Sequence, residues 1–131
     1  MMPCSSDAPL MRQISYARDQ EKTMIHSTVR IVIKPEKQNE AFAILSSIVE
    51  WTRVESGCIA CRVYRDAQED GSLMFEEIWK NEEDLNRHIR TDEYRNVLLV
   101  MEMAIEKPEI RFETVSQVTG IETIEKARAL A

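Results

Sequence analysis

The chain is poor in the residues that mark several common classes of enzyme. Three glycines in 131 residues leave neither a Gly-rich phosphate loop nor a G-x-S-x-G nucleophile turn. The two histidines, His26 and His88, lie far apart and form no H-E-x-x-H or similar metal-ligand spacing. Nucleotide, flavin and hydrolase chemistry is therefore not expected, and we predict neither a metal nor an organic cofactor.

Clustered positive charge and long apolar runs are also lacking. The chain has 17 Lys and Arg against 23 Asp and Glu, a net charge of −6, and no basic run of the kind that binds nucleic acid. No stretch approaches the roughly 20 apolar residues that cross a bilayer. The N-terminus has no apolar core of signal-peptide type, so we expect a cytoplasmic protein that contacts neither nucleic acid nor membrane.

Cysteine is scarce, and its spacing invites a redox or zinc interpretation. Cys58 and Cys61 form a C-x-x-C sequence, and Cys4 is the third cysteine. On a strand, residues three apart point to opposite faces, and zinc needs further Cys or His ligands. We therefore expect Cys58 and Cys61 to be small apolar strand residues in a reducing compartment.

What is present is a regular alternation of strand and helix patterns, of a length that suits one domain. Strands alternate apolar and polar residues with period two, and helices repeat apolar residues every three or four positions. The predicted elements are a strand over 25–33, a helix from Pro35 to about Val54, strands over 58–65 and 73–80, a helix after Asn81, a second helical stripe (Tyr94, Val97, Leu98, Met101, Ile105) and a strand over 110–118.

With the two helical segments after the third strand counted as one helical connection, this order is β-α-β-β-α-β, which is the ferredoxin-like split βαβ fold of the α+β class: one antiparallel sheet with helices on one face. We expect the domain to occupy residues 25–118. Residues 1–24 form an N-terminal extension with a short helix around 10–20, and residues 119–131 form a tail or a short helix.

The other face of the sheet mixes apolar and charged residues. The side chains expected there are Arg30, Val32, Met74, Glu76, Ile78, Arg111, Glu113 and Val115. Such a face is too apolar for free solvent and too charged for a monomer core. We therefore predict a homodimer that packs sheet against sheet.

Chemistry-bearing side chains gather in residues 72–94. Phe75, Glu77 and Trp79 share one strand face with Leu73. Asn81 is predicted to cap the helix that follows, with Asp84 as its capping partner three residues later. On the helix that follows, His88 lies on the inner side with Leu85 and Ile89. A carboxylate, an indole and an imidazole are thus directed towards one apolar space.

Each of these groups has a functional and a structural interpretation. His88 titrates near neutral pH and could accept a proton, or it could be a core histidine. Glu77 on an apolar face needs a partner or a raised pKa; a structural partner would be a backbone amide, Arg53 or Arg62. Trp79 could form a stacking wall or simply fill the core. Two hydroxyls, of Tyr64 and Tyr94, could complete the site.

The same stretches resemble the antibiotic biosynthesis monooxygenase (ABM) domain family, including its quinol-monooxygenase-like members. The similarity covers about 25–118, and the E-x-W motif followed nine residues later by His is its most specific part. The matching segments are Glu55-Ser56-Gly57-Cys58, Tyr64-Arg65-Asp66, Phe75-Glu76-Glu77-Ile78-Trp79, Leu85 with His88, and Thr91-Asp92-Glu93-Tyr94.

The resemblance implies a dimeric α+β barrel with a pocket between sheet and helices, and oxygenation of a small aromatic substrate by molecular oxygen without metal or flavin. In this comparison His88 is the proton acceptor and Glu77 is the neighbouring acid that orients partners. The substrate-binding residues would be Trp79, Phe75, Tyr64 and Tyr94. Cys61 stands where the family often has a tyrosine. Haem is disfavoured, since no Asn lies on the first strand.

Two other functions fit the same residues. An isomerase of a small phosphorylated metabolite would move protons with His88 and Glu77, and would need cations such as Arg30, Arg53, Arg62 or Arg90. A non-catalytic dimeric small-molecule-binding or stress-response module would use the same pocket without turnover.

Overall fold

The computed structural model describes residues 23–130, so the predicted helix around 10–20 lies outside the described residues. The element order is strand, helix, two strands, two helices, strand and helix. Their bounds are β1 Ile25–Val32, the short 3-10 helix η1 Pro35–Lys37, α2 Gln38–Thr52, β2 Cys58–Arg65, β3 Ser72–Trp79, α3 Glu82–Ile89, α4 Arg95–Glu102, β4 Glu109–Thr114 and α5 Ile121–Leu130.

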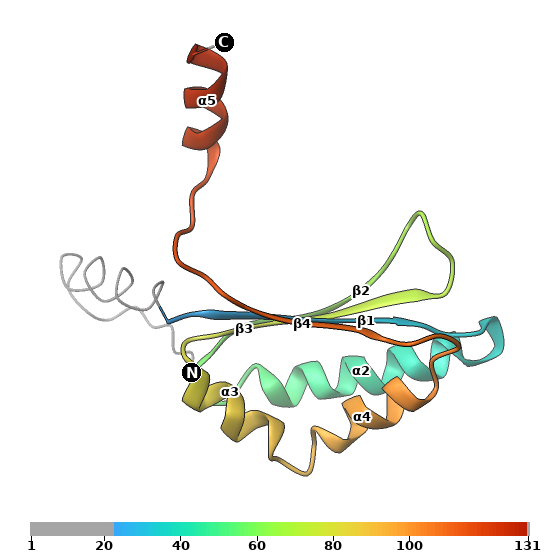
Figure 1. Ribbon diagram of the computed structural model, residues 1–131. Coiled ribbons are helices and arrows are strands. Elements are labelled where there is room, and N and C mark those ends of the chain that lie inside the picture. The colour runs from blue at the N-terminus through green and yellow to red at the C-terminus, as the bar shows by residue number, and fades with distance from the viewer. Residues whose placement is uncertain (1–22, 131) are drawn as a thin grey trace.

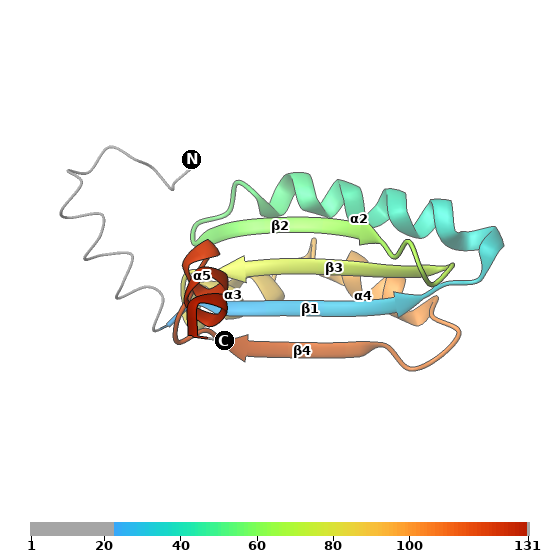
Figure 2. The ribbon, with the colours of Figure 1, turned by 90° about the horizontal axis from the view of Figure 1, so that it is seen from above.

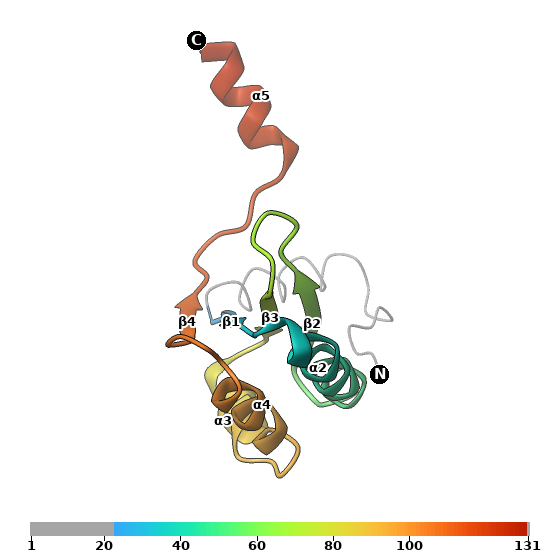
Figure 3. The ribbon, with the colours of Figure 1, turned by 90° about the vertical axis from the view of Figure 1, so that its right-hand side faces the viewer.

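The four strands form one antiparallel sheet in the order β2-β3-β1-β4. Helices α2, α3 and α4 all lie against one face of this sheet, as Figure 1 shows from the side and Figure 3 along the strands. The prediction of a ferredoxin-like α+β fold is therefore confirmed. Among residues 23–130, no helix is long and apolar enough to cross a membrane.

The core lies between the sheet and its helix layer. Helix α2 buries Ala41, Leu45, Ile48 and Val49 against Val29 and Ile31 of β1 and their neighbours, at the helical spacing that the sequence predicted. Helix α4 buries Val97 and Val100. The expected apolar stripe was partly wrong there. Leu98 and Ile105, which were expected to be buried, are exposed, and Val100, which was not in the stripe, is buried.

The edge strand β4 is shorter and more exposed than expected. It ends at Thr114 instead of Val118. Ile110 and Phe112 pair in register with the buried residues Val29 and Ser27, yet both remain about half exposed, at 48% and 49%. The helix layer therefore does not cover this edge of the sheet. The predicted C-terminal helix is present as α5, which stands clear of the sheet in Figures 1 and 3. Figure 2, seen from above, shows it over the end of the sheet where β1 begins and β3 ends.

A tight turn joins α2 to β2 and packs against the start of α3. Gly57 has φ +87°, and a Cβ there would overlap the Asp84 side chain. The same turn receives a hydrogen bond from Arg87 to the Ser56 carbonyl (3.2 Å) and one from the Lys80 amide to the Gly57 carbonyl (2.8 Å). These contacts bring the end of α2 beside α3, although the two are distant in sequence.

We call the sheet surface opposite α2–α4 the open face; it carries His26, Arg30, Tyr64, Met74, Glu76 and Ile78. On it, Glu76 lies 2.7 Å from His26 Nε2 and accepts a hydrogen bond from the Tyr64 hydroxyl (2.8 Å). Burial alone would raise the pKa of Glu76, but these two hydrogen bonds bring the pKa below its ordinary value. Arg30 pairs with Glu69. The open face is thus a surface of paired charges around half-buried Met74 and Ile78.

The packing predicts a sharp contrast between two leucines. Leu45 is fully buried on α2, whereas Leu98 on α4 is 47% exposed. Leu45→Ala should lower the free energy of unfolding by about 2–5 kcal/mol through lost burial and a cavity. Leu98→Ala, the matched control, should change it by about 0.5 kcal/mol or less. Urea denaturation followed by circular dichroism measures both, and equal losses would contradict this assignment of the core.

Candidate functional site

Glu77 is a fully buried carboxylate in the middle of the sheet. Strand alternation turns it towards the helices with Phe75 and Trp79. Its oxygen Oε1 accepts a hydrogen bond from Trp79 Nε1 (3.2 Å), and Oε2 lies 2.6 Å from His88 Nε2. The cost of burying a charge here is therefore offset by an indole donor and an imidazole.

Helix α3 places His88 opposite that carboxylate. Asn81 caps the helix by accepting a hydrogen bond from the Asp84 amide (2.8 Å), as the sequence predicted, and α3 then turns Leu85 and His88 inwards. The imidazole is fully buried. Its second nitrogen, Nδ1, lies 3.1 Å from both carboxylate oxygens of Glu55, in the turn after α2.

Aromatic rings enclose the imidazole. The Trp79 ring centroid is 4.7 Å from that of His88, and the Tyr94 ring meets His88 edge-on at 5.1 Å. Tyr94 itself is buried at the turn before α4. The result is a dry cluster of a carboxylate, an imidazole and two aromatic rings, with Glu55 at its margin.

The two carboxylates control the protonation of His88. Burial alone would lower the pKa of the imidazole, but the hydrogen bond and charge of Glu77, followed by those of Glu55, raise the pKa above its ordinary value. Burial first and the Glu77 charge second raise the pKa of the Tyr94 hydroxyl and of the Cys61 thiol. The cluster therefore favours an imidazolium beside a neutral phenol and a neutral thiol.

The structure brings together most, but not all, of the predicted site residues. Glu77, Trp79, His88 and Tyr94 form the cluster, and Phe75 lies buried in the same core. Tyr64 is elsewhere, because its strand position pairs with Met74 and so faces the opposite side of the sheet.

The suggested arginine partners of Glu77 were wrong. Arg53 donates instead to the Cys61 carbonyl (3.0 Å), and Arg62 pairs in register with Glu76, on the open face. Arg30 is also on the open face, and Arg90 is exposed at the end of α3. The structure thus does not gather the four arginines that a phosphorylated substrate would need.

The cysteine prediction was half right. Cys58 and Cys61 are both buried, but they share a face, because a register shift between Cys58 and Ala60 adds a residue to β2. Within residues 23–130, no group of three His, Cys, Asp or Glu side chains is arranged to hold a metal ion.

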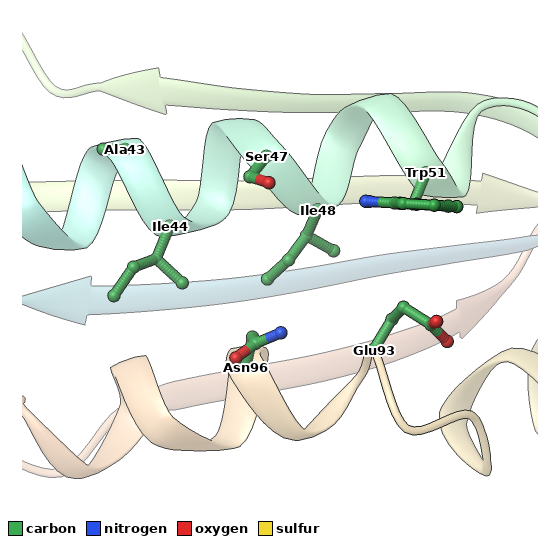
Figure 4. Close-up of a pocket in the computed structure, with 7 residues that line it drawn as sticks. All are labelled: Ala43, Ile44, Ser47, Ile48, Trp51, Glu93 and Asn96. Atoms are coloured by element: carbon green, nitrogen blue, oxygen red, sulfur yellow. The ribbon is translucent and has the colours of Figure 1, made fainter.

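Two surface hollows lie away from the buried cluster. The larger, of about 370 Å³, runs between α2 and the start of α4, and Figure 4 shows its wall of Ala43, Ile44, Ser47, Ile48 and Trp51 facing Glu93 and Asn96. The smaller, of about 280 Å³, is on the open face around Met74. Glu77, Trp79 and His88 line neither hollow, so their rings and carboxylate fill the space that the sequence suggested as a pocket.

Comparison with known proteins agrees with this architecture. The sequence profile described as antibiotic biosynthesis monooxygenase matches residues 24–98, which is more than half of the chain and includes the whole buried cluster. The chain belongs to the antibiotic biosynthesis monooxygenase family. The family resemblance noted from the E-x-W and His spacing is therefore confirmed.

The names of solved structures similar to this chain carry little functional description. A conserved protein from Methanosarcina mazei Go1 is 31% identical, with a TM-score of 0.68 over 74% of this chain and 97% of that one. A structure named antibiotic biosynthesis monooxygenase is 23% identical, with a TM-score of 0.63 over 73% and 99% of the two chains, and supports the fold alone.

A curated relative also matches part of the chain. The uncharacterized Synechocystis protein sll1783 is 39% identical over 61 residues, which are 47% of this chain and 42% of that protein. The chain thus spans less than half the length of this relative. Its name states no activity and no substrate.

The raised pKa of His88 predicts a pH dependence of stability. A group whose pKa is higher in the folded state stabilises the fold fully below its unfolded pKa of about 6.5 and loses that contribution as pH rises through the folded-state value. The free energy of unfolding should therefore fall on raising the pH above about 6.5. His88→Gln, whose amide can still donate to Glu77, should remove this component. Urea denaturation at a series of pH values measures it, and identical profiles for the two proteins would contradict the assignment.

Proposed function

We propose that this chain is a cofactor-independent monooxygenase acting on a quinol or another phenolic aromatic. The observation that carries the proposal is the buried Glu77–His88 pair, enclosed by the rings of Trp79 and Tyr94, in a chain of the ABM family. A base held in a dry, aromatic environment suits removal of a phenolic proton.

The proposed reaction uses the substrate as its own reductant. The neutral form of His88, which is populated above its raised pKa and keeps its remaining proton towards Glu77, accepts a hydroxyl proton. The resulting phenolate is rich enough in electrons to reduce molecular oxygen. One oxygen atom enters the ring and the other leaves as water, so that a dihydroxyaromatic becomes a hydroxylated quinone. In this scheme His88 holds the proton, Glu77 orients the imidazole, and Trp79 both positions Glu77 and stacks on the substrate.

Access to the pair requires a movement. Tyr94 covers His88 from a turn, and the neighbouring residue Glu93 lines the hollow between α2 and α4. We propose that the substrate enters from this hollow, beside the exposed ring of Trp51, and displaces Tyr94. A turn is better suited to such a displacement than the strand that carries Trp79.

Complete burial of His88 also favours a second candidate, a non-catalytic small-molecule-binding module. A fully buried ion pair can serve structure alone. In that case a ligand would occupy the hollow between α2 and α4 without reaching the pair, and would raise the melting temperature without being consumed.

An oxygen electrode distinguishes the two candidates. With a panel of dihydroxyaromatics, the wild-type chain should consume oxygen, and His88→Gln should reduce the rate by about 10²–10⁴-fold, the usual contribution of a general base. Glu82→Gln, on the exposed side of the same helix, is the matched control and should leave the rate unchanged. No uptake by correctly folded wild-type chain across the panel would contradict the monooxygenase proposal.

We also propose a homodimer through the open face. Half-buried Met74 and Ile78 lie there among paired charges, and no helix of the α2–α4 layer covers them. The C-terminal helix α5 rises on this same side, with Ile121 and Ile124 more than half exposed, so a second copy on the sheet would also meet α5 (Figure 3). Burial of such a mixed face suits an isologous interface.

Sedimentation at micromolar concentration tests this interface. The wild-type chain should sediment as a dimer, and Met74→Glu should shift it towards monomer by placing an unpaired charge in the contact. Leu99→Glu, which adds the same charge to an exposed position of the helix layer, should leave the dimer intact. A monomeric wild-type chain would contradict the proposal.

A further inference from the structure

Glu55 connects the sealed interior of the cluster to solvent. The side chains of His88 and Glu77 are 0% exposed, whereas that of Glu55 is 25% exposed. Because each imidazole nitrogen faces a different carboxylate, the three groups form a continuous line: Glu55, Nδ1 and Nε2 of His88, and Glu77. One end of the line touches water, and the other does not.

We propose that Glu55 is a positioning residue through which the buried Glu77–His88 pair exchanges its proton with solvent. The part of this proposal that concerns turnover rests on the proposed monooxygenase function; the proton path itself does not. The proposal gives Glu55 a function. Neither the strand and helix pattern nor the E-x-W and His spacing assigns a role to this side chain.

The proton balance of the path is simple. At rest His88 carries a proton on each ring nitrogen. Nδ1 releases its proton to the Glu55 carboxylate and Glu55 gives it to water, which leaves a neutral imidazole whose remaining proton stays on Nε2, towards Glu77. In the reverse direction Glu55 takes a proton from water and passes it to Nδ1. Each nitrogen–hydrogen bond that breaks is matched by an oxygen–hydrogen bond that forms, so the imidazolium is restored without turning the ring.

The turn after α2 holds Glu55 in place for this task. Its amide donates to the Thr52 carbonyl (3.0 Å), and its carbonyl accepts from the Cys58 amide (3.2 Å). The turn is packed against α3 by the close approach of Gly57 to Asp84, and Asp84 is in turn paired with Arg87. The carboxylate therefore meets Nδ1 from a fixed backbone and not from a flexible loop.

The other groups around His88 do not offer a competing route. From β2, the Cys61 thiol faces Glu77 and is kept protonated by burial, which raises its pKa. From the turn before α4, the Tyr94 hydroxyl has a raised pKa for the same reason. From β3, Trp79 only donates, to Glu77. Glu55 is thus the solvent-side acceptor that the described part of the chain provides.

Nuclear magnetic resonance of the full chain with 15N-labelled histidine tests the path without any substrate. We compare the wild type with Glu55→Gln, Glu55→Asp and the control Glu50→Gln, which removes the same charge from an exposed position near the end of α2. Two quantities are measured for His88: the pKa of the imidazole, and the rate at which its Nδ1 proton exchanges with water.

Glu55→Gln should lower the pKa of His88 by about one unit or more, because an opposite charge is lost, and should slow the exchange of the Nδ1 proton. Glu55→Asp should be intermediate in both, and Glu50→Gln should match the wild type. A lowered pKa with unchanged exchange would overturn the path, since Glu55 would then act by charge alone. Equal behaviour of Glu55→Gln and Glu50→Gln would overturn it as well.

A second readout keeps the two proposals apart. If the chain consumes oxygen with a dihydroxyaromatic, Glu55→Gln should lower kcat with little change in KM, and should shift the pH profile of kcat to lower pH. Slowed exchange without any oxygen uptake would leave the path standing and remove the monooxygenase. Should Glu55→Gln fail to fold, Glu55→Asp decides alone, and exchange as fast as in the wild type would overturn the path.

Discussion

The structure depends on one short contact in its interior, between the Glu77 carboxylate and the His88 imidazole at 2.6 Å. A lone carboxylate in the middle of a sheet would be very costly to bury, and an unpaired imidazolium nearly as costly. The contact between the carboxylate and the imidazolium offsets the cost of burying both charges. The placement of β3 against α3, the capped start of α3 and the stacking of Trp79 and Tyr94 all serve to hold the two groups together.

The regular elements could be predicted because each depends on local periodicity. The alternation of β1 and β3, the stripe of α2 and the Asn81 cap are all visible in neighbouring residues. The errors arose where distant packing decides. Val100 replaced Leu98 as an inward residue through the placement of α4, β4 stopped at Thr114, and a bulge in β2 turned Cys58 and Cys61 to one face.

The candidate site was predictable only in part, for the same reason. Strand and helix faces direct Glu77, Trp79 and His88 to one space, but they cannot show that the rings fill it. The sequence pattern did not identify Glu55 as a site residue, because its contact with His88 depends on a turn that folds back onto α3. The one local signal was the Glu-Ser-Gly sequence directly after a helix. Tyr64 was expected in the site but faces the opposite side of the sheet, because its orientation depends on the register of β2 against β3.

Family membership and fold do not determine the reaction, since one fold supports many activities. The proposed chemistry therefore depends on the buried pair of Glu77 and His88. The account stands on His88 holding a proton between two carboxylates in a dry site. The most direct measurement is the 15N chemical shift of both His88 ring nitrogens in the wild-type chain as a function of pH. We predict two protonated nitrogens at pH values clearly above the ordinary imidazole pKa of about 6.5. A neutral His88 already at that pH would contradict the account.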